Sequence, residues 1–135
     1  PASAAPMDGY DWHFDSNAEE VQLAYGIANS DEIPFGFSCR RGSGRIVMNA
    51  TTLNSALKTI TLATSETSQT YRARQEEAVM FDGYLLEAET AADDALLASF
   101  DKTGWLSIEN DGAWVGLAPQ SGTKVQSADF IAACR

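Results

Sequence analysis

The chain of 135 residues contains one histidine, His13, so any Ser–His–Asp or Cys–His relay would have to use it. Three carboxylates surround it in the sequence: Asp8, Asp11 and Asp15. Their spacing matches no calcium-binding loop, and a zinc site would lack the usual His/Cys set. On an alternating strand, His13 would point away from its aromatic neighbours, toward solvent. A surface histidine is therefore the main prediction, and a small hydrolase that uses His13 with these acids is the alternative.

Two short motifs match, in order, those of serine penicillin-recognising enzymes. They are Ser55-Ala56-Leu57-Lys58 and Lys102-Thr103-Gly104. That fold needs a much longer chain and an intervening Ser-Asp-Asn element, which this sequence lacks. The second motif is also explained by the end of a helix. We therefore predict no catalytic residue, no metal and no cofactor.

The two cysteines are Cys39, in an alternating apolar run, and Cys134, next to the last residue. A disulfide between them would close a loop of about 95 residues, worth roughly 4–5 kcal/mol in the chain-entropy picture. Such bonds persist in exported proteins. Two buried free thiols of a cytosolic protein are the alternative, because free cysteine behaves as a small hydrophobe.

The N-terminus favours export, since residues 1–6 are small residues and prolines of the kind found just past a cleavage site. A cloning boundary would look the same. We expect residues 1–9 to be a flexible tether and residues 10–135 to be one domain. The predicted location is periplasmic or extracellular, including lipid anchoring through a removed N-terminal segment. No apolar run approaches 18 residues, so no transmembrane segment is expected.

The charge balance is 9 Lys+Arg against 19 Asp+Glu, a net charge of −10, which argues against binding to nucleic acid or anionic membranes. Most bases lie in residues 40–74. Two arginines flank a Gly-Ser-Gly turn, and two more are predicted to share one face of a strand. The five that could converge on a small anionic ligand or an envelope protein are Arg40, Arg41, Arg45, Arg72 and Arg74. Surface ion pairs of little value are the alternative.

Hydrophobic alternation predicts a largely β structure. Strands are expected at residues 21–25, 35–39, 46–50, 57–63, 71–75, 84–88, 105–108 and 113–117. The last two flank Asp111-Gly112, a dipeptide typical of tight hairpin turns. A short helix is expected at 91–100 with Thr90 as N-cap, and a terminal helix at 121–134 that carries Cys134.

These elements predict an α+β, mainly β fold. It would be a single antiparallel β-sandwich or incomplete barrel of seven or eight strands, with one or two helices packed on it. The C-terminal helix would be tethered by the disulfide.

The last 50 residues, together with Cys39, resemble a recurring arrangement in small exported proteobacterial proteins. The resemblance lies in Asp94-Ala95-Leu96-Leu97, Trp105-Leu106-Ser107-Ile108, a hairpin partner, and Phe130-Ile131-Ala132-Ala133-Cys134. The nearest groups are the invasion-associated locus B-like and VasI-like periplasmic domains. In these proteins an upstream strand cysteine pairs with the terminal-helix cysteine. The resemblance implies a periplasmic, non-catalytic β-rich domain and transfers no active site.

The aromatic side chains could either form the floor of a ligand-binding groove or pack in the core, and packing in the core is the main prediction. They are Trp12, Trp105, Trp114, Tyr10, Tyr25, Tyr71 and Tyr84. The sequence therefore favours a periplasmic or envelope-associated binding or accessory module that acts through a surface, with its ligand unspecified.

Overall fold

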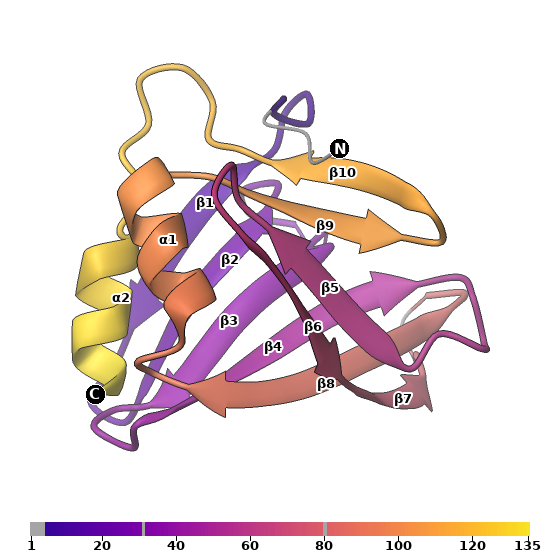
Figure 1. Cartoon of the computed structure of the whole chain (residues 1–135), viewed down its shortest axis with the longest axis horizontal. Coiled ribbons are helices and arrows are strands. Elements are labelled where there is room, and N and C mark those ends of the chain that lie inside the picture. Colours follow the sequence, from indigo (N-terminus) through magenta and orange to yellow (C-terminus); the bar gives the residue numbers. More distant parts are fainter. Residues whose placement is uncertain (1–4, 31, 80) are drawn as a thin grey trace.

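A computed structural model of the chain describes residues 5–30, 32–79 and 81–135. Ten strands within these ranges form two antiparallel sheets that face each other, and two helices cover one end of the pair (Figure 1). The sheets do not close into a barrel. The predicted mainly β fold, a sandwich with two packed helices, is therefore confirmed.

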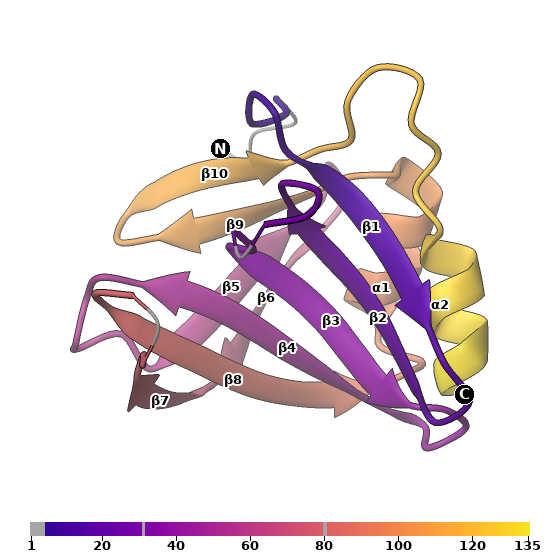
Figure 2. The same ribbon diagram turned by 180° about the vertical axis from the view of Figure 1, so that it is seen from behind.

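The larger sheet has six strands in the order β1-β2-β3-β4-β8-β7, and Figure 2 faces its outer side. The strand bounds are β1 Asp11–Ser16, β2 Glu20–Gly26, β3 Phe35–Arg40, β4 Arg45–Thr52, β7 Arg74–Glu77 and β8 Tyr84–Ala91. Every neighbouring pair is antiparallel. Alternation along β3 sends its large apolar side chains inward and leaves small residues on the outer face.

The smaller sheet has four strands in the order β10-β9-β5-β6. Their bounds are β5 Thr59–Ala63, β6 Ser68–Arg72, β9 Leu106–Asn110 and β10 Ala113–Leu117. The predicted hairpin around Asp111 and Gly112 is present, and both residues have positive φ, 55° and 86°. Glycine adopts that backbone conformation at no steric cost, which explains the turn.

The space between the sheets is filled by aromatic side chains. Trp12 stacks on Phe37 and approaches Phe100 of helix α1 (Ala95–Thr103), with ring centroids 6.2 and 5.0 Å apart. The Trp12 indole donates a hydrogen bond to the Leu117 carbonyl, and the buried Tyr25 hydroxyl donates one to the Ala118 carbonyl. These bonds join the first two strands to the end of β10 and the residue that follows it. Trp12, Tyr25 and Tyr71 are therefore core residues, while the other four aromatics of the predicted set are half-buried.

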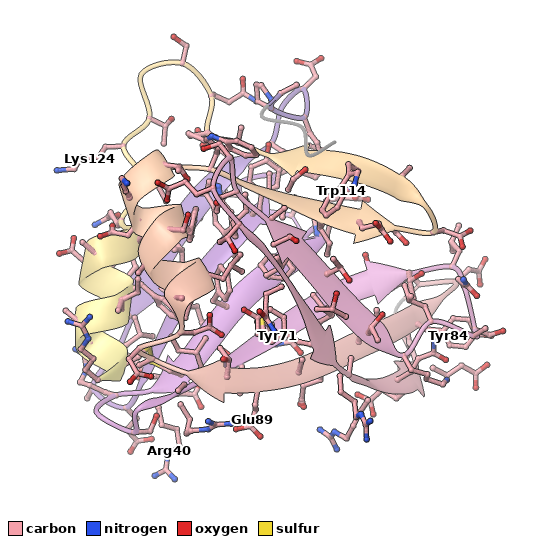
Figure 3. All side chains as sticks on the ribbon, in the orientation of Figure 1. Arg40, Tyr71, Tyr84, Glu89, Trp114 and Lys124 are labelled. Atoms are coloured by element: carbon pink, nitrogen blue, oxygen red, sulfur yellow. A yellow bond between two sulfur atoms is a disulfide. The ribbon has the colours of Figure 1, made fainter. Side chains whose placement is uncertain are left out.

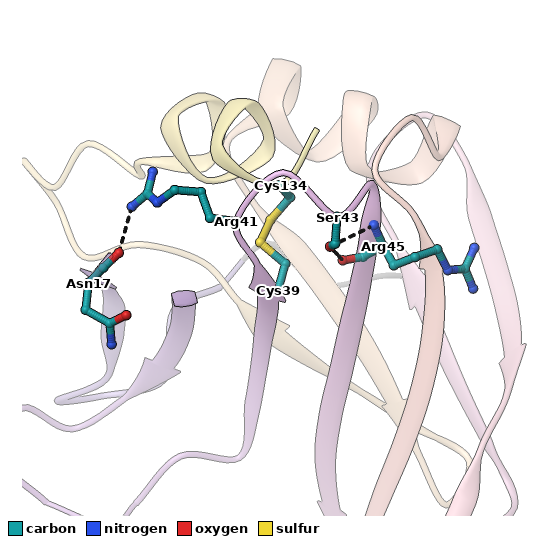
Figure 4. The surroundings of a disulfide bond; sticks show 6 residues. All are labelled: Asn17, Cys39, Arg41, Ser43, Arg45 and Cys134. Atoms are coloured by element: carbon teal, nitrogen blue, oxygen red, sulfur yellow. Dashed lines mark hydrogen bonds between the residues drawn. A yellow bond between two sulfur atoms is a disulfide. The ribbon is translucent and has the colours of Figure 1, made fainter. Parts of the chain in front are cut away.

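The disulfide between Cys39 of β3 and Cys134 at the end of α2 (Ser127–Cys134) is present, with the Cα atoms 5.8 Å apart (Figure 4). The turn after β3 also caps this helix. The backbone N–H groups of Gly42 and Gly44 donate to the carbonyls of Ala133 and Cys134. The helix end, which would otherwise leave its last carbonyls unpaired, is thus held by a covalent bond and two hydrogen bonds.

Helix α1 (Ala95–Thr103) begins later than predicted. Its N-cap is Asp94, whose side chain accepts from the Leu96 N–H, because Thr90 still belongs to strand β8. The carboxylate of Asp94 also accepts from the hydroxyls of Thr90 and Tyr71. Burial and the hydrogen bond to Asp94 raise the pKa of the Tyr71 hydroxyl. A carboxylate with several donors is a better cap than the hydroxyl expected from the sequence.

The predicted strand at 71–75 is two strands. The chain bends at Ala73, which is buried and donates its N–H to the Lys58 carbonyl, and it passes there from β6 of the small sheet to β7 of the large one. Arg72 and Arg74 therefore belong to different sheets, and the prediction that they share a face of one strand was wrong. Alternation alone does not reveal a residue at which the chain changes sheets.

At the N-terminus, Met7 is bound to the domain. Its N–H donates to the Tyr25 hydroxyl, and its carbonyl accepts from the Gln120 amide. Residues 1–4 of the expected tether lie outside the described residues. No helix in the described part of the chain is long and apolar enough to cross a membrane.

Candidate binding surface

His13 lies on the outer face of β1 and is exposed, as predicted. Its Nε2 lies 3.1 Å from the Gly26 carbonyl oxygen, which is its one hydrogen-bond partner among the described residues. A shallow hollow beside His13 is also lined by Ser30, but the Ser30 hydroxyl donates a hydrogen bond to the Ile27 carbonyl. Histidine, hydroxyl and carboxylate therefore form no hydrogen-bonded relay in the described structure.

The acids near His13 have other partners. The carboxylate of Asp11 accepts from the Thr123 hydroxyl and from the Gln120 and Trp12 N–H groups, so it fastens the segment after β10 to β1. In the described ranges no three His, Cys, Asp or Glu side chains gather to hold a metal ion. The surroundings of His13 thus have a structural explanation.

The two penicillin-enzyme motifs lie at opposite ends of β5. Ser55 and Lys58 belong to the loop before the strand, where Lys58 Nζ donates to the Ser55 carbonyl. Lys102 belongs to α1 and pairs with Glu66 in the turn after the strand, with Nζ 2.6 Å from Oε2. Five residues of strand separate the two sites by roughly 16 Å, so they cannot share a substrate.

Glu66 and its neighbours fasten α1 to the small sheet. The Ser99 hydroxyl donates to Glu66 and lies 2.6 Å from the buried Thr64 hydroxyl. Hydrogen bonds from Lys102 and then from Ser99 hold the pKa of the Glu66 carboxyl below its ordinary value, and Glu66 in turn raises the pKa of Lys102. Every polar group in this network has a partner, which indicates a structural role.

The five predicted arginines do not form one patch. Arg45 and Arg74 both lie on the outer face of the large sheet, but Arg45 pairs with Glu89 and Arg74 pairs with Glu87. Their register partners on β8 are four residues apart, about 13 Å along the strand. Arg72 belongs to the other sheet.

The remaining two arginines lie at the disulfide end, as does Arg45. Arg41 donates to the Asn17 carbonyl (Figure 4), and Arg40, at the end of β3, makes no ion pair with a described residue. Figure 3 places Arg40 and Glu89 at this end of the sheet and Tyr84 at the opposite end. The convergence of all five fails because Arg72 belongs to the small sheet and Arg74 to β7 at the edge of the large sheet, away from the β3–β4 turn that carries Arg40, Arg41 and Arg45.

A shallow trough crosses the outer face of the large sheet. Its central row runs from β1 to β7 through six register partners, so the side chains of the row share one face. They are His13, Ala24, Gly36, Asn49, Glu87 and Arg74. The five strand spacings give the row a length of about 24 Å. The central hollow, of about 150 Å³, lies over Ala24 and Gly36, and the neighbouring hollows share lining residues with it.

The second surface feature is an apolar end, which we define as Ile33, Leu53, Val79 and Phe81. Leu53 and Val79 are 81% and 95% exposed, values rare for large aliphatic side chains that have no partner. Leu53 and Phe81 belong to different loops but lie over the same glycine. A Cβ built on Gly83 would lie 3.3 Å from a carbon of each side chain.

Topology brings these loops together. The loops that follow β2, β4 and β7 all leave the large sheet at the same end, because the strands alternate in direction (Figure 2). The disulfide and α2 lie at the other end. Ile33 connects the apolar end to the trough, since it lines the central hollow with Thr51 and Leu85. Sequence reasoning missed this site because exposed apolar loop residues show no periodicity.

Carboxylates border the apolar end. Glu77 and Asp82 flank Val79 and Phe81 along the chain. On the side of Leu53, Asp111 accepts a hydrogen bond from Asn54. The surface therefore combines an apolar centre with an acidic border, which is the usual anatomy of a protein interface.

Comparison of the chain with protein-family models, with curated proteins and with solved structures finds no match. The functional argument therefore rests on the geometry.

Proposed function

We propose that this protein is a non-catalytic binding or accessory module of the periplasm or cell envelope, and that it holds a partner protein at its apolar end. The observation that carries the proposal is the meeting of Leu53 and Phe81 over Gly83, with the exposed Val79 two residues before Phe81 in the chain. Bulky apolar side chains on two loops are costly to expose without a use, and contiguous apolar patches mark interaction sites.

The chemistry of the border indicates the partner. The carboxylates of the border favour a partner protein whose apolar pocket is surrounded by Lys or Arg, because the charges would be complementary. They belong to Glu77, Asp82 and Asp111. The same carboxylates, and the net charge of −10, disfavour an anionic lipid surface and a second copy of this chain.

The disulfide supports the location. A bond between Cys39 and Cys134 persists in an oxidising compartment and is rare in a reducing one. The proposed resemblance to invasion-associated locus B-like and VasI-like periplasmic domains agrees with such a location. The disulfide would then stabilise the folded module outside the cytoplasm.

Site-specific photocrosslinking tests the function. A photoreactive amino acid is placed at position 53 or 79, and in the control at Ala98, which is exposed on α1 near the other end of the molecule. In cells that make the protein, positions 53 and 79 should give the same discrete crosslinked protein and position 98 should not. Crosslinks to lipid, or none at either position, would contradict the proposal.

A further inference from the structure

We propose that the trough on the large sheet is a second binding site, adjoining the apolar end at Ile33 but distinct from Leu53, Val79 and Phe81, and that it takes a neutral, hydroxyl-rich ligand of the oligosaccharide class. The argument starts from its polar side chains. Gln22, Ser38, Asn49 and Thr51 surround the central hollow. Gln22 and Asn49 are exposed and Ser38 and Thr51 half-buried, and none of the four side chains has a hydrogen-bond partner within the described part of the molecule, so all four can bind a ligand.

These groups are uncharged. An amide both donates and accepts, and a hydroxyl does the same, so this set matches the hydroxyl groups of a sugar. Phosphate or carboxylate ligands would need free cations. The one cation in the central row, Arg74, already donates to both carboxylate oxygens of Glu87.

The floor of the trough admits a flat ligand. Ala24 and Gly36 are neighbours in the row, and they present only a methyl group and a backbone CH₂ to the outside. Ile33 and Leu85 form one apolar wall. A sugar ring can place its C–H face on such a floor while its hydroxyls reach the amides at the sides. The length of about 24 Å across six strands suits an extended chain.

The test is titration of the protein with neutral oligosaccharides of four to six units, namely cello-, chito-, malto- and xylo-oligosaccharides, by calorimetry and by amide NMR. At least one should bind and shift the amide signals of Gly36, Ser38 and Asn49. Gly36→Val should weaken that binding at least tenfold, because its methyl groups fill the floor. Ala113→Val, the same kind of change on exposed β10, should leave it unchanged.

A second variant guards against misfolding of the first. Asn49→Ala removes one amide from an exposed strand position and should weaken binding several-fold without filling the trough. Leu53→Ser should not affect it, which separates this site from the proposed protein-binding end. The inference is overturned if no oligosaccharide shifts the trough amides, if binding survives Gly36→Val, or if the trough selects peptides from a display library instead.

Discussion

Ala24 of β2 and Gly36 of β3 are register partners at the floor of the trough, and a Cβ built on Gly36 would lie 3.4 Å from the Ala24 Cβ. That distance is an ordinary van der Waals contact, so a side chain at position 36 would fit on the outer face. Gly36 is thus not required by the backbone, which has no positive φ at this position. Its small size matters for the depth of the trough.

Gly36→Val should therefore leave the fold intact. Valine favours a strand and restricts the unfolded chain, so the free energy of unfolding should stay constant or rise by up to about 1 kcal/mol. Urea denaturation followed by circular dichroism measures this. A loss of more than about 2 kcal/mol would show that the glycine has a structural role instead.

Replacing both cysteines, Cys39→Ser with Cys134→Ser, should lower the free energy of unfolding. The disulfide closes a loop with a sequence separation of 95, and the chain-entropy account gives a loss of about 4–5 kcal/mol.

Deleting residues 125–135 removes the disulfide together with the buried side chains of α2, so cooperative unfolding should be lost. A truncated protein that melts at the wild-type temperature would contradict this role.

The ion pair between Glu66 and Lys102 predicts a defined pH dependence. Because the folded state lowers the pKa of Glu66, this group contributes stability above its ordinary value of 4.5, and the contribution disappears as the pH falls through the folded value. Glu66→Gln should therefore reduce stability at pH 7 and flatten its decline below pH 4.5. Glu109→Gln, at an exposed position of β9, is the matched control for the change of residue type.

His13→Ala should change little. The side chain is exposed and has one hydrogen bond, to the Gly26 carbonyl, so the change in unfolding free energy should stay within about 0.5 kcal/mol. Thermal unfolding and a screen of esterase, peptidase and glycosidase substrates provide the check. A hydrolytic activity that disappears in this variant, with stability intact, would favour the alternative function.

Much of the fold follows from patterns in the sequence. Alternation at Phe35, Phe37 and Cys39 predicts both the strand and its buried face, and Asp111-Gly112 predicts a hairpin. The bend at Ala73 does not follow, because nothing in the local pattern distinguishes a strand that continues from one that changes sheets.

The proposed binding surface is harder to predict. The trough depends on which strands are neighbours, since Asn49 and Glu87 are far apart in the chain and meet only through the pairing of β4 with β8. The apolar end depends on loops that converge because strand directions alternate. Leu53 and Phe81 carry no periodic pattern, and burial of apolar residues would be the ordinary expectation for both.

The most direct test of the proposed function is the dissociation constant for the crosslinked partner. Leu53→Ser combined with Val79→Ser removes two apolar side chains that are 81% and 95% exposed, so the fold should be unaffected. Loss of central interface residues should raise the dissociation constant at least about 30-fold, while Ala98→Ser should leave it unchanged. A change of less than about threefold in the double variant, with its fold intact, would contradict the claim that this end of the protein holds the partner.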